Sequence, residues 1–315
     1  MTLPKILVDI PVPPELRKLL VGLCHFQTFA DYDAAPGSAE EVRALFTYAH
    51  PEIDGAFMDR FPSLKIISNF GVGVDHLDLE AATARDLPVG NTPGAVDGAT
   101  ADFAFALLMA AARGVVTGDR FARSPEFTHF DPSLNVATEV HGSVLGIFGM
   151  GGVGRQIARR ASGFDMRVLY HNRNRDLDTE EKLGVEYATR EKILSEAQFV
   201  MLSLPLTPET TRFIGAEELW LMRPDAFLVN VARGPVVDTE ALYRALMAGT
   251  IRGAAVDVTD PEPLPRDHPL LELRNIVIAP HLGSAADRSR MRMAEMSVEN
   301  LRLGLAGEDL RWRVV

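Results

Sequence analysis

The glycine-rich run at residues 149–154 constrains the fold of this chain more than any other feature. The apolar segment over residues 143–148 predicts a buried strand, and the segment over residues 155–161 has the spacing of a helix. Between a strand and a helix, a G-x-G-x-x-G pattern allows a tight turn, close approach of the backbone to a pyrophosphate, and close helix–strand packing. Because the first amides of the helix then face the phosphates, we expect a dinucleotide site formed by Gly149, Gly151, Gly152, Val153 and Gly154.

The rest of the chain alternates between short apolar runs and helical patterns, which predicts parallel sheets covered by helices on both faces. Short helices are expected over Pro14–Leu20 and Ser38–Ala44, the second beginning with Ser38 and Glu41 as a capping box. Longer helices are expected over residues 99–113 and 285–305. Strands are expected over residues 5–9, 25–29, 45–48, 64–68, 144–148, 167–170, 185–187, 199–202, 226–230, 254–258 and 276–279.

A Pro-Gly break at residues 91–94, just before the first long helix, predicts a domain crossing. With 315 residues the chain is long enough for two domains. We therefore expect an α/β fold of two doubly wound parallel-sheet (Rossmann-like) domains with an active-site cleft between them. Residues 1–93 and 285–315 would form a flavodoxin-like substrate domain, and residues 94–284 the dinucleotide-binding domain.

Composition excludes several other classes of function. A formal net charge of −11 disfavours a broad contact with nucleic acid or an anionic membrane. The single cysteine, Cys24, excludes an internal disulfide and a multi-cysteine metal cluster, so no metal site is expected. The N-terminus lacks a secretory pattern and no apolar run has the length of a membrane span. We expect a cytoplasmic protein with no nucleic-acid or membrane partner.

Four further segments each follow a predicted strand, on the edge where open α/β sheets bind their ligands. They supply a glycine-rich loop, an arginine, a glutamate and a histidine, and lie at residues 69–73, 230–234, 257–263 and 280–284. Each residue alone has a common structural explanation, such as a surface ion pair, a solvated loop carboxylate or a turn cap. Their joint placement on one sheet edge predicts a catalytic site.

With these motifs the chain resembles, over essentially its whole length, the D-isomer-specific 2-hydroxyacid dehydrogenases, and among them the glyoxylate/hydroxypyruvate reductases. The resemblance is strongest over residues 253–265 and continues through residues 268–271 to residues 280–285. It implies hydride transfer from a nicotinamide cofactor to a small 2-keto acid, such as glyoxylate or hydroxypyruvate, giving the D-2-hydroxy acid.

The resemblance also implies a role for each candidate residue. Arg233 matches the arginine that binds the substrate carboxylate and keto oxygen, for which its planar fork is suited. His281 matches the proton donor, and Glu262 matches the carboxylate that orients this histidine and favours the imidazolium. The backbone amides of Val72 and Gly73 match the loop that holds the substrate carboxylate.

Four more residues are expected to contact the cofactor. Asp257 matches a family position that hydrogen-bonds the nicotinamide amide, although an aspartate after a strand is also a common capping residue. The other three are Thr100, Val231 and Ser284.

The loop after the second strand of the dinucleotide domain indicates which nucleotide is bound. NAD enzymes usually carry an acid there that binds the ribose hydroxyls. Residues 171–175 contain no acid, and Arg173 and Arg175 could bind a 2′-phosphate. We expect NADP(H) to be preferred, with NAD(H) possible. The alternative is a solvated basic loop, with Asp176 or Asp178 reaching the ribose.

The chain departs from the common family pattern after the first long helix. Many members carry a tryptophan there, whereas residues 121–130 of this chain contain phenylalanines, which leaves the pocket shape and the subunit contact open. A homodimer formed through the helix near residues 99–113 is a family expectation.

Two other functions are possible on the same fold. One is a non-catalytic, nucleotide-sensing regulator, which the presence of Arg233, Glu262 and His281 disfavours. The other is oxidation of formate or phosphite, but formate enzymes of this type carry glutamine where this chain has Glu262.

Overall fold

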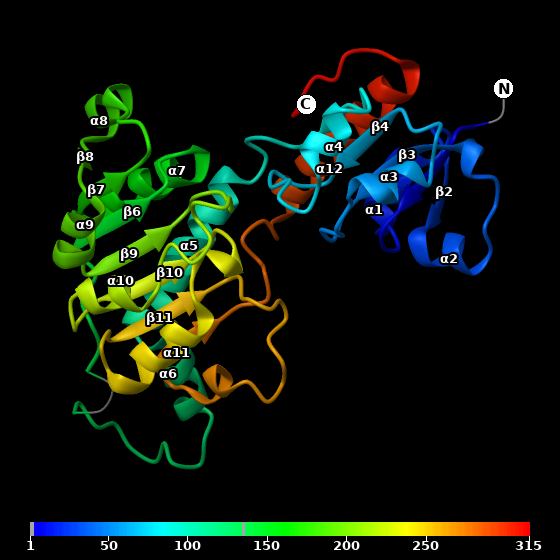
Figure 1. Cartoon of the computed structure of the whole chain (residues 1–315). Coiled ribbons are helices and arrows are strands. Elements are labelled where there is room, and N and C mark those ends of the chain that lie inside the picture. The colour runs from blue at the N-terminus through cyan, green and yellow to red at the C-terminus, as the bar shows by residue number, and fades with distance from the viewer. Residues whose placement is uncertain (1–2, 134–135) are drawn as a thin grey trace. The chain divides into compact units, whose positions relative to one another are not determined.

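The computed structural model describes residues 3–133 and 136–315, which divide into two compact units. Unit 1 combines the N-terminal part of the chain up to Val96 with the C-terminal part from Ala285 onward, and unit 2 comprises Asp97–Ser284. Figure 1 shows unit 1 in blue, cyan and red, because both ends of the chain contribute to it. Each unit is a parallel sheet with helices on both faces, so the expected fold class is confirmed.

Unit 1 contains a five-stranded sheet in the order β2-β1-β3-β4-β5, which is the flavodoxin-like order. Its strands are β1 (Lys5–Val8), β2 (His25–Thr28), β3 (Val42–Thr47), β4 (Ile66–Asn69) and β5 (Val89–Gly90).

Two apolar clusters cover the two faces of this sheet. Ile6 and Ile66 pack on one face, whereas the neighbouring residues Leu7 and Ile67 pack on the other, as the two-residue period of a strand requires. Helices α1 (Pro14–Leu20) and α12 (Asp287–Ala306) cover the first face. The second face is covered by α2 (Phe29–Ala34), α3 (Gly55–Asp59) and α4 (Leu79–Thr83).

Unit 2 contains a seven-stranded sheet in the order β12-β11-β10-β9-β6-β7-β8. The first strand of the unit, β6, lies between β7 and β9, so the strand order reverses beside it, as in the classic dinucleotide-binding fold. The strands are β6 (Val144–Phe148), β7 (Arg167–His171), β8 (Glu186–Tyr187), β9 (Phe199–Leu202), β10 (Phe227–Asn230), β11 (Gly253–Val256) and β12 (Ile276–Ile278).

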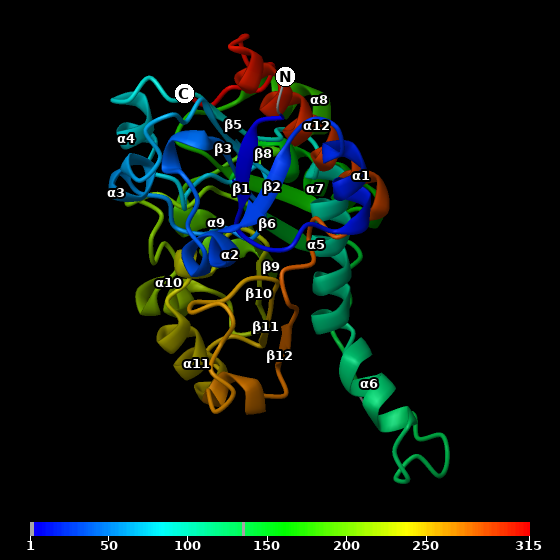
Figure 2. The same ribbon diagram turned by 90° about the vertical axis from the view of Figure 1, so that its right-hand side faces the viewer.

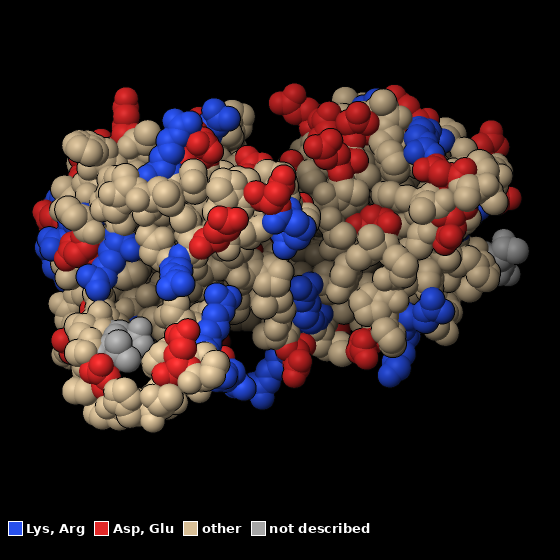
Figure 3. All heavy atoms as spheres, turned by 90° about the horizontal axis from the view of Figure 1, so that it is seen from below, with Lys and Arg blue, Asp and Glu red and all other residues tan. Residues whose placement is uncertain are grey.

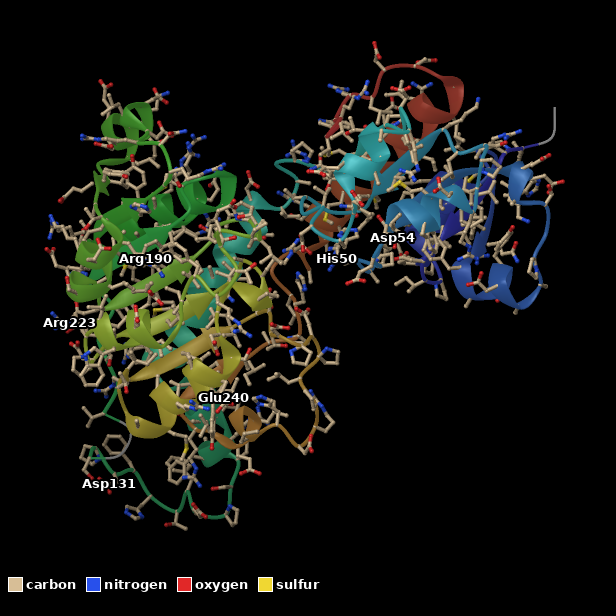
Figure 4. All side chains as sticks on the ribbon, viewed as in Figure 1. His50, Asp54, Asp131, Arg190, Arg223 and Glu240 are labelled. Atoms are coloured by element: carbon tan, nitrogen blue, oxygen red, sulfur yellow. The ribbon has the colours of Figure 1, made fainter. Side chains whose placement is uncertain are left out.

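The helices of unit 2 also divide between the two faces of its sheet. One apolar cluster joins α5 (Asp97–Ala112) and α7 (Gly152–Ala161) to the sheet, and the other joins α9 (Arg190–Glu196), α10 (Ala216–Leu221) and α11 (Thr239–Ala248) to it. Arg190, labelled in Figure 4, connects α9 to α10 through a 2.9 Å ion pair with Glu218. The remaining helices are α6 (Val115–Ala122) and α8 (Leu177–Leu183), and four short 3-10 turns complete the described elements: η1 (Ala39–Glu41), η2 (Ser162–Phe164), η3 (Gly234–Val236) and η4 (Pro269–Glu272).

The predicted helix over Ser38–Ala44 is wrong. The chain forms the short turn η1 there and then enters strand β3 at Val42, and the Ser38 side chain caps nothing. The segment Val42–Thr47 is almost wholly buried between β1 and β4, so burial in the sheet outweighs the local capping signal. Helix α2, which the sequence did not predict, begins where the Thr28 hydroxyl accepts a hydrogen bond from the Asp31 amide at 3.0 Å.

Figure 3 shows basic and acidic side chains interspersed over the visible face rather than gathered into one basic surface. Among the described residues, no single helix has both the length and the apolar composition to cross a membrane; α5 and α6 satisfy those criteria only as a pair bent by 61°.

Two helical glycines should respond in opposite ways to alanine. A Cβ on Gly304 of α12 would lie 2.6 Å from the Cβ of Ile66, whereas a Cβ on Gly118 of α6 would have no protein atom within 4 Å. We expect Gly304→Ala to lower the free energy of unfolding by about 1–3 kcal/mol through overpacking. Gly118→Ala should raise it by about 0.5–1 kcal/mol through helix propensity. Urea denaturation followed by circular dichroism measures both, and stabilisation by Gly304→Ala would contradict this packing.

Candidate active site

The glycine-rich loop between β6 and α7 has a distinct requirement at each of three glycines. Gly149 has φ of +94°, a conformation that other residues rarely adopt. A Cβ on Gly154 would lie 2.1 Å from the Gly149 carbonyl oxygen, so this glycine permits close packing of the helix on the turn. A Cβ on Gly151 would meet no protein atom within 4 Å, so at this glycine the backbone borders open space. These are the three functions that a dinucleotide-binding loop demands of its glycines.

The start of α7 is suited to an anion. Gly151 is the N-cap of this ten-residue helix, and it has no side chain that could accept a hydrogen bond from the first amides. The preceding amide, of Met150, donates to the Asn172 side chain at 2.7 Å, which ties the loop to the end of β7. The absence of a side chain at Gly152 leaves room for the Asp97 carboxylate. The loop therefore fits the pyrophosphate of a dinucleotide.

The two arginines expected to bind a 2′-phosphate differ in their surroundings. Arg175 forms a bidentate ion pair with Glu180, with donor–acceptor distances of 2.8 and 2.7 Å. Arg173 is exposed and forms no ion pair with any described residue. Of the pair, Arg173 is the one whose guanidinium is not already engaged by a carboxylate.

Asp176, the alternative ribose ligand, has a structural role. Its side chain caps α8 by accepting from the Thr179 amide at 3.0 Å, and it pairs with Arg155 at 2.7 Å. Hydrogen bonds from Thr179 and Arg155 lower the pKa of Asp176 to about 2. These contacts do not favour the interpretation in which Asp176 binds the ribose.

His281 and Glu262 lie in direct contact at the carboxyl edge of the sheet of unit 2. The Nδ1 atom of His281, which follows β12, is 2.7 Å from Oε1 of Glu262, which follows β11. Both side chains are partly exposed, at 31% and 40%, so a small molecule can reach the imidazole. The other oxygen of Glu262 accepts a weak bond from the Thr259 amide at 3.4 Å.

The turn that carries His281 is built around the buried carboxylate of Asp257. Its two oxygens accept from the amides of Leu282 at 2.6 Å and Gly283 at 2.7 Å, and the His281 amide donates to the Asp257 carbonyl at 2.8 Å. This network holds His281 at φ of +57°. Burial raises the pKa of Asp257, and the two amide hydrogen bonds oppose that effect.

This positioning role was not evident from the sequence, because Asp257 is 25 residues from Leu282 along the chain. The predicted bond from Asp257 to the nicotinamide amide stays a prediction. Thr100, another expected cofactor contact, lies close to this turn. A Cβ on Gly283 would be 3.3 Å from the methyl group of Thr100 and 2.9 Å from the Asp257 carboxylate. Ser284 follows directly in the chain, so three of the expected cofactor contacts gather at this turn.

Arg233 lies on the loop after β10, against the loop of Glu262. A Cβ on Gly234 would be 1.9 Å from the Thr259 carbonyl oxygen, so only glycine allows this approach of the two backbones. Buried Asn230, which the sequence analysis did not single out, orders the loop by accepting from the Ala232 amide at 3.0 Å and donating to the Arg233 carbonyl at 2.9 Å. Val231 lies within this ordered segment.

Val72 and Gly73 lie in unit 1, on the loop after β4. Val72 is 38% exposed. Within the described parts of the chain, no group of three or more His, Cys, Asp or Glu side chains is arranged to hold a metal ion.

The fold and the site of unit 2 define a Rossmann-type dinucleotide-binding protein with a paired histidine and carboxylate. The family described as D-isomer specific 2-hydroxyacid dehydrogenase, NAD binding domain, matches residues 105–283. The chain belongs to this family.

Two glyoxylate reductases are similar to this chain over most of their length. It is 47% identical to a glyoxylate reductase of Korarchaeum cryptofilum over 88% of this chain and 86% of the relative. It is 40% identical to one of Thermococcus litoralis over 97% of this chain and 95% of that relative.

Among solved structures, a protein from Thermus thermophilus matches with a TM-score of 0.89 and 42% identity, covering 99% of this chain and 100% of the other. The NADPH-dependent glyoxylate/hydroxypyruvate reductase of Sinorhizobium meliloti, in complex with NADP and malonate, matches with a TM-score of 0.89 and 31% identity, covering 99% and 97%.

Two glycine substitutions should separate cofactor binding from folding. We expect Gly151→Ala to weaken NADPH binding by at least about tenfold, because its methyl group would occupy the space of the phosphates, with a stability loss of about 1 kcal/mol from the poorer N-cap. Gly154→Ala should reduce both affinity and thermal stability, because its Cβ would collide with the Gly149 carbonyl oxygen. Fluorescence titration and thermal denaturation test this, and unchanged NADPH affinity in Gly151→Ala would contradict the assignment.

Proposed function

We propose that this protein uses NADPH to reduce a small 2-keto acid, glyoxylate or hydroxypyruvate, to the D-2-hydroxy acid. The observation that carries the proposal is the 2.7 Å contact between His281 and Glu262 on the ligand-binding edge of a dinucleotide-binding sheet. The similarity to proteins named glyoxylate reductase supports the choice of substrate. In this proposal unit 2 binds the dinucleotide and unit 1 contributes the loop of Val72 and Gly73 to substrate binding.

The proton role of His281 follows from its contact with Glu262. A carboxylate only accepts hydrogen bonds, so Nδ1 of His281 carries a proton and donates to Glu262. This leaves Nε2 of the imidazolium to donate its proton to the carbonyl oxygen of the substrate. Arg233 would bind the substrate carboxylate and keto oxygen and balance their charge. A bound NADPH would supply the hydride to the keto carbon.

We also propose a preference for NADP(H), with Arg173 as the principal ligand of the 2′-phosphate. Arg173 is exposed and forms no ion pair with the described residues, whereas the Arg175 guanidinium is bound by Glu180. The end of β7 carries Asn172, bonded to Met150, instead of an acid that would repel a phosphate.

We propose a homodimer as the working form. Helix α6 extends beyond the body of unit 2 in Figure 2, and this region exposes apolar side chains, including Val115 at 56% and Phe130 at 81%. Exposed apolar side chains gathered in one region are typical of protein interfaces. Sedimentation at the monomer mass of 34.5 kDa would contradict the dimer.

Replacement of His281 by alanine should lower kcat by about a hundred- to ten-thousand-fold, because the proposed proton donor is lost. The dissociation constant of NADPH should change little. Glu262→Gln should lower kcat less, because the amide keeps the size of the side chain but removes the carboxylate charge beside His281.

Glu240→Gln serves as the matched control for this experiment. Glu240, labelled in Figure 4, lies on α11 and pairs with Arg244 at 2.9 Å, so its replacement should leave kcat unchanged. Wild-type kcat in the His281→Ala variant would remove His281 from the mechanism.

Steady-state kinetics with both nucleotides tests the cofactor proposal. The wild-type enzyme should show a higher kcat/KM with NADPH than with NADH. Arg173→Ala should raise the KM for NADPH about 10–100-fold, the effect of one charge-assisted contact, and leave the KM for NADH unchanged. Arg175→Ala should have the smaller effect, because Glu180 already binds that side chain. A clear wild-type preference for NADH would contradict the proposal.

A further inference from the structure

The loop of Val72 and Gly73 is held by a buried side-chain amide at the end of β4. Asn69 is 1% exposed, and its Oδ1 accepts from the Thr47 hydroxyl at 2.8 Å. That bond turns its Nδ2 toward the loop, where it donates to the carbonyl of Gly71 at 3.1 Å and to that of Gly73 at 2.9 Å. One asparagine therefore binds two carbonyls of a three-residue segment.

A second asparagine binds the carbonyl between these two. Nδ2 of Asn91 donates to the Val72 carbonyl at 2.8 Å. The Asn91 backbone is itself fixed, because its amide donates to the carbonyl of Trp312 at 3.1 Å and its carbonyl accepts from Asn300 of α12 at 3.0 Å. The three successive carbonyls of Gly71, Val72 and Gly73 are thus each bonded to a side-chain amide.

This arrangement determines where the amides of the loop point. In a planar trans peptide the N–H points opposite to the carbonyl of the preceding residue. The Gly71 carbonyl is bound by Asn69 and also by the Thr92 amide at 3.0 Å, so the Val72 N–H points away from Asn69. The Val72 carbonyl is bound by Asn91, so the Gly73 N–H points away from Asn91. Neither N–H donates to another residue in the described parts of the chain.

We propose that Asn69 and Asn91 are positioning residues that direct the amides of Val72 and Gly73 at the substrate carboxylate. The inference rests on the proposed function, since the carboxylate is that of the 2-keto acid. Backbone N–H groups of successive loop residues can form a binding site for an anion. Because the loop is bonded before substrate arrives, its amides need no reorganisation to bind the carboxylate.

The test separates this role from a purely structural one by comparing KM with stability. Asn69→Leu removes both bonds to the loop and Asn91→Ala removes one. Ser68→Ala is the control: Ser68 adjoins Asn69 on β4, is equally buried, and donates to the Ser297 carbonyl at 2.7 Å without contacting the loop. All three variants lose buried hydrogen bonds, so their melting temperatures should fall.

Only the asparagine variants should bind the keto acid more weakly. We expect the KM for glyoxylate and the inhibition constant of oxalate to rise about 10–100-fold in Asn69→Leu and about 3–10-fold in Asn91→Ala. The KM for NADPH should stay unchanged in both, and kcat should fall less than KM rises. In Ser68→Ala both glyoxylate KM and oxalate inhibition should equal the wild-type values.

Wild-type KM and oxalate inhibition in both asparagine variants would overturn the inference while leaving the proposed function intact. An equal rise in Ser68→Ala would also overturn it, because a general loss of stability would then explain the effect. A wild-type enzyme that reduces no 2-keto acid would contradict the proposed function itself, and the inference with it.

Discussion

Buried polar side chains at the carboxyl ends of parallel strands organise the loops that carry the candidate chemistry. Strands end there with backbone groups that the sheet no longer pairs, and a buried group without a partner is costly. Asn69 at the end of β4, Asn230 at the end of β10 and Asp257 just after β11 each satisfy such groups from the loops beyond. All three are at most 3% exposed, so their hydrogen bonds are shielded from water. The loop of Val72 and Gly73, the loop of Arg233 and the turn of His281 are each shaped by one of these residues.

Glycines allow these loops to approach one another closely, because they have no side chain at the points of contact. Gly234 admits the Thr259 carbonyl, and Gly283 admits the side chains of Asp257 and Thr100. Any larger residue at Gly234 would separate the loop of Arg233 from that of Glu262. The same loops show how a scaffold of buried strands can hold partly exposed side chains such as His281 at defined positions.

Much of the fold could be predicted because its signals are local. Helix α1 has the predicted limits, Pro14–Leu20, since its apolar spacing and its proline at the start agree with its packing. The strands lie within a few residues of their predicted positions because each is a short apolar run. The error at Ser38–Ala44 arose where a local capping signal and a buried strand competed for the same residues. The two-residue strand β5 was not predicted.

The sequence by itself determined the fold class, the strand–turn–helix at residues 149–154 and the residue types that reach the ligand-binding edge, because these depend on periodicity and on neighbours along the chain. Only the tertiary structure decided which of two similar arginines is bound by a carboxylate, that Asp257 holds the turn of His281, and that Asn69 and Asn91 together bond one loop. Such contacts depend on how separate strand ends and loops meet. The spacing of residues along the chain does not encode the direction in which a side-chain amide or carboxylate points once those strands are side by side.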